Sequence, residues 1–169
     1  SINPLDYPVC LTRPLRLGPS AWLEHTPFAM FIMDLLRPSV FVELGTHNGV
    51  SYCSFCQAAR ELGLETRAYA VDSWEGDPHS GFYGREVLDD LRAYHDPRYG
   101  EFSRLIQSTF DEAANYFSDG SIDLLHIDGF HTYEAARHEF EMWLPKLSAR
   151  GVVLFHDTNV RENGLACGN

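Results

Sequence analysis

Acidic and histidine side chains directly follow two short apolar runs of the sequence. Asp128 and His131 come after the first run, and His156 and Asp157 come after the second. Converging carboxylates repel one another unless a cation or hydrogen-bond donors lie between them, and oxygen ligands suit a divalent ion such as Mg²⁺. His131 lies one helical turn after Asp128 and can act as a general base near neutral pH. These residue types predict a metal or acid–base site, provided that the fold brings the two runs together.

A structural explanation of the same segment is the alternative. Asp128 or Thr132 can instead cap the helical pattern that runs from Tyr133 to Leu147. For the remaining histidines of this kind we expect structural rather than functional roles: His25, His95, His126 and His138.

A glycine-containing segment follows an earlier apolar run, Val40–Val42. It reads Glu43-Leu44-Gly45-Thr46-His47-Asn48-Gly49-Val50-Ser51. Gly45 and Gly49 let the backbone approach a ligand closely where a helix begins and its free N–H groups point outward. The spacing is not the G-x-G-x-x-G of dinucleotide-binding folds, and the carboxylate of Glu43 suits a ligand with a positive pole better than a pyrophosphate.

An acidic residue, Asp72, ends the next apolar run. A carboxylate at such a position commonly holds the two hydroxyls of a ribose. Ser73 and Trp74 follow it, and the indole offers an aromatic face. Together with the glycine segment, Asp72 favours a nucleoside site. The glycine-punctuated stretch 72–84 is interpreted either as a mobile lid over that site or as a plain surface loop.

The elements that must position these residues alternate along the chain. Five short apolar runs, bounded by turn residues, predict strands at 40–42, 68–71, 102–106, 122–127 and 152–155. Helical patterns fill the gaps at 49–62, 87–94, 113–117 and 133–147. Ser20 can cap an earlier helix that Pro38 stops and that Pro27 can divide. The alternation predicts an α/β fold, a doubly wound, mostly parallel sheet with helices on both faces, whose carboxyl strand ends share one edge.

Length, composition and charge narrow the function classes. The chain has 169 residues, enough for one domain, and a formal net charge of -11. That charge argues against a protein that tracks nucleic-acid phosphates and against binding to an anionic membrane. Of the four cysteines, Cys53 and Cys56 form a C-x-x-C within a helical pattern, and we interpret them as two small apolar residues. Without a signal-peptide pattern at its start, the sequence predicts a reducing, cytoplasmic setting.

These residues together resemble the class I S-adenosylmethionine-dependent methyltransferases. The segment 42–51 is similar to their first motif, and Asp72 is similar to the acid that closes their second strand. The segments 72–77, 127–133 and 155–157 resemble, more narrowly, the bacterial branch called methyltransferase domain 24, which includes Mg²⁺-assisted O-methyltransferases of sugars and other natural products. The resemblance implies a methyltransferase domain at 20–158 and leaves a short tail at 159–169. Four prolines and little periodicity predict an irregular arm at 1–19.

The resemblance also implies roles for single residues. Glu43 would lie near the methionine amino group, and the loop between Gly45 and Gly49 near the methionine moiety. Asp72 would hold the ribose. The full set of implied cofactor contacts is Glu43, Gly45, Thr46, Asn48, Gly49, Ser51, Asp72, Ser73, Trp74, Ser108, Thr109 and Phe110.

The implied chemistry is O-methylation of a small-molecule hydroxyl, with His131 and Asp128 as catalytic residues. Asp128 and Asp157 would ligate a metal. Family members that use one often carry a second acid where this chain has His156, so two alternatives stay open: Mg²⁺ held by Asp128, Asp157 and His156, or catalysis without a metal.

The length leaves further alternatives. A full class I sheet has two more strands after its fifth, and the 12 residues after Asp157 are too few for a helix and two strands. The sequence thus predicts a fold lacking its last two strands, with the fifth strand's edge covered by the N-terminal arm, by a second copy in a homo-oligomer or by further residues. Two hypotheses stand beside the O-methyltransferase. The second is a catalytically weak or inactive binding subunit, and the third is a nucleotide-dependent oxidoreductase.

Overall fold

A sheet of five parallel strands forms the centre of the molecule. The computed structural model describes residues 3–77, 81–129 and 133–156. The strands are β1 (Val40–Leu44), β2 (Arg67–Asp72), β5 (Ser103–Gln107), β6 (Ile122–Ile127) and β7 (Leu147–Phe155). Their order in the sheet is β5-β2-β1-β6-β7, and every neighbouring pair is parallel. The predicted doubly wound α/β fold is confirmed.

Side chains alternate between the two faces along each strand, and each face has its own core. Phe41 packs into one buried cluster and Val42, the next residue, into the other. β6 is buried along its whole length because helices cover it from both sides. The residues that follow the strands are therefore held by a core on each side of the sheet.

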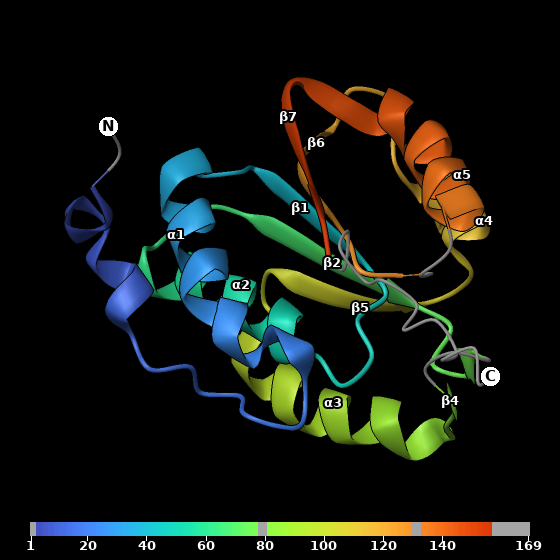
Figure 1. Cartoon of the computed structure of the whole chain (residues 1–169), viewed down its shortest axis with the longest axis horizontal. Helices are drawn as coiled ribbons and strands as arrows, with labels where there is room; N and C mark the ends of the chain where they lie inside the picture. Colours follow the sequence, from blue (N-terminus) through green and yellow to red (C-terminus); the bar gives the residue numbers. More distant parts are fainter. Residues whose placement is uncertain (1–2, 78–80, 130–132, 157–169) are drawn as a thin grey trace, which may run out of the picture.

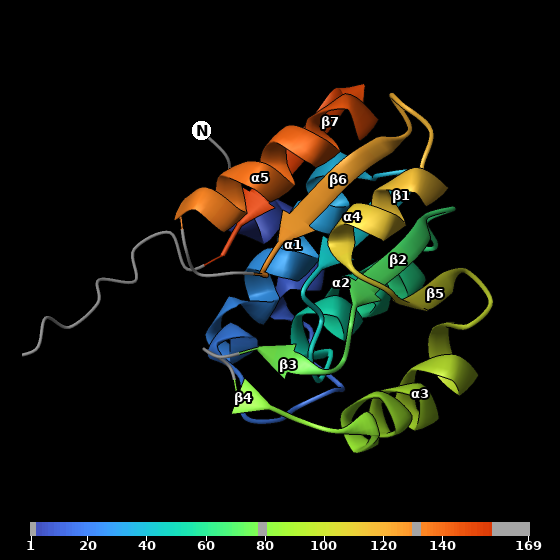
Figure 2. The ribbon, with the colours of Figure 1, turned by 90° about the vertical axis from the view of Figure 1, so that its right-hand side faces the viewer.

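Helices cover both faces (Figures 1 and 2). The helical elements of the first face are η3 (Ala21–His25), α1 (Thr26–Leu36), α2 (Val50–Glu61) and α3 (Arg85–Tyr99). Those of the second face are α4 (Phe110–Ala113), η4 (Ala114–Tyr116) and α5 (Tyr133–Trp143). The sites where strands end and helices begin lie together beyond the carboxyl edge of the sheet, as the parallel arrangement requires.

The first helix is divided as the sequence predicts. Ser20 accepts a hydrogen bond from the backbone N–H of Trp22 and so caps η3. Pro27 lies in the first turn of α1, which begins at Thr26. A proline fits there because the first turn of a helix leaves its N–H groups without helical partners.

The predicted helix from Tyr133 to Leu147 is too long. α5 ends at Trp143, and a short 3-10 turn, η5 (Leu144–Lys146), connects it to β7. Leu147 belongs to the strand and is the register partner of Ile122. Pro145 explains the difference, since a proline cannot donate the hydrogen bond that would continue the helix.

The segment before η3 contains two short 3-10 turns, η1 (Pro4–Asp6) and η2 (Pro8–Leu11). η2 packs against α1, with Val9 and Cys10 buried. A two-stranded antiparallel hairpin, β3 (Gly76–Asp77) and β4 (Gly81–Phe82), lies beyond the end of β2 and before the start of α3 (Figure 1). The hairpin therefore stands at the edge of the sheet where the predicted nucleoside site lies.

The C-x-x-C pair is part of the core. Cys53 and Cys56 lie in α2, buried and with free thiols. Burial raises the pKa of the Cys53 thiol to about 12, so it is not a nucleophile near neutral pH. The interpretation of both residues as small apolar side chains is confirmed.

β7 is the last strand at one edge of the sheet. In the ranges that the structure describes, no strand pairs with the outer edge of β7. How that edge is covered stays a prediction. Over the same ranges, none of the helices combines the length and the apolar character needed to cross a membrane.

Candidate functional site

The loop between β1 and α2 is built around two glycines in left-handed conformations. Gly45 has a φ of 85° and Gly49 a φ of 77°, and Gly49 directly precedes α2. A Cβ at Gly45 would collide with the backbone carbonyl of Asp128, just after β6. Gly45 is therefore required because two loops of the site touch at that point, a reason separate from the ligand approach that the sequence suggested.

Asp72 ties this loop to the segment after β2. One carboxylate oxygen accepts a hydrogen bond from the backbone N–H of His47 (2.8 Å), and the other accepts from that of Trp74 (2.8 Å). The indole Nε1–H of Trp74 in turn donates to the carbonyl oxygen of His47 (2.8 Å). Both residues adopt positive φ angles, 48° at His47 and 53° at Trp74. Such conformations are strained outside glycine, and here three hydrogen bonds hold them in place.

Trp74 does not lie on an open surface. Its side chain is 1% exposed and lies beneath the loop that it supports, while Asp72 is 8% exposed. The predicted contact of Trp74 with adenosine remains a prediction. Each carboxylate oxygen of Asp72 retains a lone pair for a further hydrogen bond.

The segment after β5 adjoins Asp72. The backbone N–H of Ser108 donates to the carbonyl oxygen of Asp72 (3.0 Å), and Thr109 caps α4 by accepting from the N–H of Glu112. The ring of Phe110 lies near Gly129, where it would obstruct a Cβ. The fold thus brings the predicted cofactor contacts after β5, which begin at Ser108, next to Asp72, the predicted ribose ligand.

An aromatic contact connects the hairpin to the glycine loop. The rings of Tyr83 and His47 have centroids 4.7 Å apart. Behind the hairpin, Gln107 donates from its side-chain amide to the carbonyl of Ser73 (3.1 Å). The predicted lid segment therefore contacts the loop, although residues 78–80 lie outside the described part of the chain.

Glu43 and His126 form a fully buried pair on neighbouring strands. The imidazole Nδ1 lies 2.8 Å from one Glu43 oxygen, and the hydroxyl of Ser51 donates to the other (3.0 Å). Burial, followed by the negative charge of Asp128, raises the pKa of Glu43 well above its usual value. Burial also lowers the pKa of His126 to about 4. Both shifts favour the neutral forms, so the pair is best described as a carboxylic acid that donates to a neutral imidazole.

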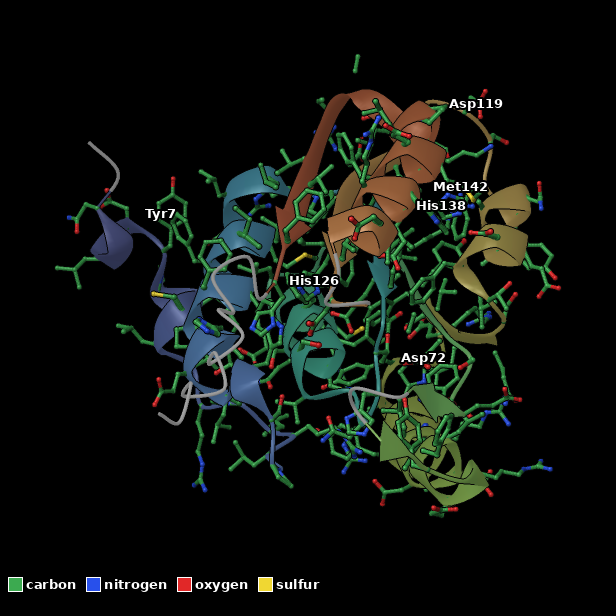
Figure 3. The ribbon with its side chains drawn as sticks, turned by 45° about the vertical axis from the view of Figure 1, so that its right-hand side comes forward. Tyr7, Asp72, Asp119, His126, His138 and Met142 are labelled. Atoms are coloured by element: carbon green, nitrogen blue, oxygen red, sulfur yellow. The ribbon has the colours of Figure 1, made fainter. Side chains whose placement is uncertain are left out.

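Aromatic rings surround this pair in the interior, where Figure 3 shows His126. The ring centroid of Trp22 lies 4.6 Å from that of His126 and 5.2 Å from that of His156. The exposed His25 contacts the ring of His156 as well, at 5.5 Å. The expectation of a structural role holds for His126, which packs within the core. No pattern in the sequence predicted that His25 would lie beside His156.

Two of the residues predicted to ligate a metal lie together. The Nδ1 of His156 is 3.0 Å from a carboxylate oxygen of Asp128. The third predicted ligand, Asp157, lies outside the described residues, and so does His131, the predicted general base. Within the described ranges, no group of three or more histidine, cysteine, aspartate or glutamate side chains could hold a metal ion. The apposition of the two apolar runs is confirmed, and the metal stays a prediction.

Sequence reasoning missed two residues of this region. Trp22 was not among the candidate site residues, yet its ring contacts both His126 and His156. Glu139 of α5 is 3% exposed, and its carboxylate lies against Gly129. An acidic residue on the apolar side of the α5 helical pattern was the signal that could have identified it.

Comparisons with known proteins identify the family. A family model described as a methyltransferase domain matches residues 42–158. Among curated proteins, the chain is similar to the uncharacterized protein y4gI of Sinorhizobium fredii, with 52% identity over 157 residues. That alignment covers 92% of this chain but only 17% of y4gI.

Solved structures share the fold at low sequence identity. Methyltransferase PaMTH1 of Podospora anserina, solved with S-adenosylhomocysteine (SAH) bound, has a TM-score of 0.62 and 16% identity, covering 78% of this chain and 51% of that one. O-methyltransferase TomG of Streptomyces achromogenes, in complex with S-adenosylmethionine, gives 0.61 and 13%, covering 82% and 56%. A methyltransferase from Geobacter sulfurreducens gives 0.59 and 15%, covering 79% and 59%. The chain thus spans between half and two thirds of these neighbours.

Proposed function

Because this chain belongs to the methyltransferase-domain family, we propose that it transfers a methyl group from S-adenosylmethionine to a hydroxyl of a small molecule. A sugar or another hydroxylated natural product is the acceptor class. The support comes from the family, from the cofactor-bound neighbours of the same fold, and from the loops at the carboxyl edge of the sheet.

One observation carries this proposal: Asp72 fastens the glycine loop to the end of β2. The two backbone N–H groups on its carboxylate come from His47 in the glycine loop and from Trp74 in the segment after β2. In the strand order β5-β2-β1-β6-β7, the connection after β1 runs to β2 on one side, and the connection after β6 runs to β7 on the other. Open α/β sheets bind ligands at such a switch point, outside the carboxyl ends of the strands.

The residues present fit the cofactor as follows. Asp72 accepts the ribose hydroxyls with its remaining lone pairs, and the loop between Gly45 and Gly49 borders the methionine end. Ser108 and the residues after it border the adenine. Since Glu43 is 0% exposed, we assign it a supporting role, in which it holds Ser51 at the start of α2.

S-adenosylmethionine, when bound, supplies a methyl group activated by its sulfonium. The transfer forms an O–CH₃ bond, breaks the S–CH₃ bond and releases the hydroxyl proton of the acceptor. We assign that proton to His131, with Asp128 and His156 beside the acceptor at the ends of β6 and β7. The sheet edge contributes mainly by aligning the oxygen with the methyl group.

A divalent metal is the less supported part of the proposal. The described residues offer it one carboxylate, from Asp128, and one imidazole, from His156. Mg²⁺ prefers oxygen ligands, so this pair alone does not form a magnesium site.

Calorimetric titration with SAH, in the presence and absence of Mg²⁺, tests the proposal. We expect micromolar-range binding, on the order of 8 kcal/mol, to the metal-free protein. A protein that folds but does not bind SAH in either condition would contradict the proposal and would favour a binding subunit that has lost its cofactor site. If SAH binding strictly required Mg²⁺, that result would support the predicted metal centre.

A further inference from the structure

The segment from Arg13 to Pro19 runs beside α2, from Gln57 in its second half to Asn48 just before its start. The backbone N–H of Leu15 donates to the side-chain carbonyl oxygen of Gln57 (2.9 Å). The amide nitrogen of Gln57 donates back to the carbonyl oxygen of Arg13 (3.0 Å). This reciprocal pair places the next residue of the arm, Arg16, over the glycine loop.

Arg16 makes three contacts with the surroundings of the cofactor loop. Its Nε–H donates to the backbone carbonyl oxygen of Asn48 (2.7 Å), and one terminal nitrogen pairs with Asp90 of α3 (2.8 Å). Its guanidinium lies over the ring of Tyr94, 4.9 Å from the centroid. Only 12% of the side chain is exposed, so both the charge and the geometry of the guanidinium are fixed.

The loop that Arg16 contacts needs support from outside. Asn48 stands between His47 and Gly49, which both have positive φ angles. A non-glycine residue in that conformation costs roughly 1 kcal/mol or more, a cost that surrounding contacts must offset. Asn48 receives such contacts on two sides, because its side-chain amide also donates to the carbonyl oxygen of Pro19 (3.0 Å).

We propose that Arg16 is a positioning residue for cofactor binding, and that the N-terminal arm is an integral wall of the cofactor site. Arg16 acts through Asn48: it fixes the backbone of the glycine loop relative to α3 before the cofactor enters. This inference rests on the proposed function, since it names what holds the cofactor loop in place.

Substitution of Arg16 tests it, with SAH as the probe and the full chain as the protein. We expect Arg16→Ala to weaken SAH binding about tenfold in calorimetry, the size of a lost charge-assisted hydrogen bond. Hydrogen exchange of a peptide that covers residues 45–49 should become faster in the same variant, while exchange within β6 stays unchanged.

Arg98→Ala is the matched control. Arg98 stacks on the same Tyr94 ring, 4.2 Å from its centroid, but its hydrogen bonds join it to Tyr94 of α3 and to Arg60 of α2, not to the glycine loop. The control should keep SAH affinity within about twofold of the unmodified chain. Equal losses in the two variants would reduce Arg16 to a packing role, and unchanged affinity in Arg16→Ala would overturn the inference.

A second substitution covers the case in which Arg16→Ala does not fold. Arg16→Lys keeps the charge beside Asp90, but a single ammonium lacks the planar fork that serves Asp90 and Asn48 together. Weaker SAH binding by Arg16→Lys at unchanged melting temperature supports positioning, and full affinity contradicts it. If the unmodified chain does not bind SAH, the proposed function fails instead, so the two failures are distinguishable.

Discussion

The carboxyl of Glu43 and the imidazole of His126 meet 2.8 Å apart on neighbouring strands, and neither side chain reaches solvent. Their residues are register partners across β1 and β6. Burial raises the pKa of the acid and lowers that of the base, so a single proton lies between the facing atoms, Glu43 Oε2 and His126 Nδ1. The proton belongs to Glu43 in this description, and the pair is uncharged.

Replacing Glu43 decides where that proton lies. Glu43→Gln retains an N–H donor toward His126 and an oxygen toward Ser51, so we expect it to change the free energy of unfolding by less than about 1 kcal/mol. Glu43→Ala leaves a cavity and a buried imidazole without its partner, and should cost about 3 kcal/mol. Urea denaturation measures both. A Gln variant as unstable as the Ala variant would mean that the native pair is ionic.

Asp72→Ala should weaken SAH binding by at least about tenfold in calorimetry. The substitution removes the proposed ribose ligand and releases the N–H groups of His47 and Trp74. Asp111→Ala is the control, because Asp111 is exposed and pairs only with the exposed His138 among the described contacts. Unaltered affinity in the Asp72 variant would remove this residue from the site.

His131→Ala should reduce methyl transfer about a hundredfold or more while SAH affinity stays the same. The reason is that a general base acts on the acceptor proton and does not contribute to holding the cofactor. SAH release, measured with a panel of sugars and vicinal diols as acceptors, gives the rate, and calorimetry gives the affinity. His138→Ala serves as the control. Parallel loss of rate and affinity would argue against the base role.

The lowered pKa of Asp123 predicts how the free energy of unfolding depends on pH. Hydrogen bonds from Arg150, and then from Ser148 and the N–H of Ser39, hold the pKa of Asp123 well below its usual range. A lowered folded-state pKa contributes stability above the unfolded pKa of about 3.9, and this contribution is lost as the pH falls below it. Asp123→Asn should therefore cost about 1 to 2 kcal/mol at pH 7 and progressively less below about pH 4.

Urea denaturation at several pH values measures this dependence. Asp119→Asn is the comparison, since the Asp119 carboxylate is 74% exposed in its pair with Lys146 and should change little at any pH. A constant difference between Asp123→Asn and the unmodified chain across pH 3 to 7 would contradict the assignment.

The strands and the site edge were predictable because local sequence determines them. Short apolar runs bounded by turn residues mark the strands, most weakly at 102–106, and the parallel arrangement brings Asp128 and His156 to one edge. The end of α5 was predicted four residues too late, because apolar spacing was counted through Pro145. Pro145 in the sequence already indicated that the helix ends before Leu147.

The environment of Glu43 could not be predicted in the same way. Strand alternation places Glu43 on the face of Phe41, but only the register between β1 and β6 brings it to His126. Register depends on contacts between residues far apart in sequence. Arg16 was missed for a related reason: the arm has no periodic pattern, and its contacts with Asn48 and Asp90 depend on the tertiary fold.

The position of β1 at the middle of the sheet has a consequence for biosynthesis. One of its neighbours, β6, lies about eighty residues later, since Glu43 and His126 are 83 positions apart. A ribosome that has released the chain through β2 has released a strand β1 with one side still unpaired, and the contact of Gly45 with Asp128 cannot exist yet. Pairings at such separations close slowly, because loop entropy must be lost first. Until β6 emerges, this strand is the part of the nascent chain most in need of protection from aggregation.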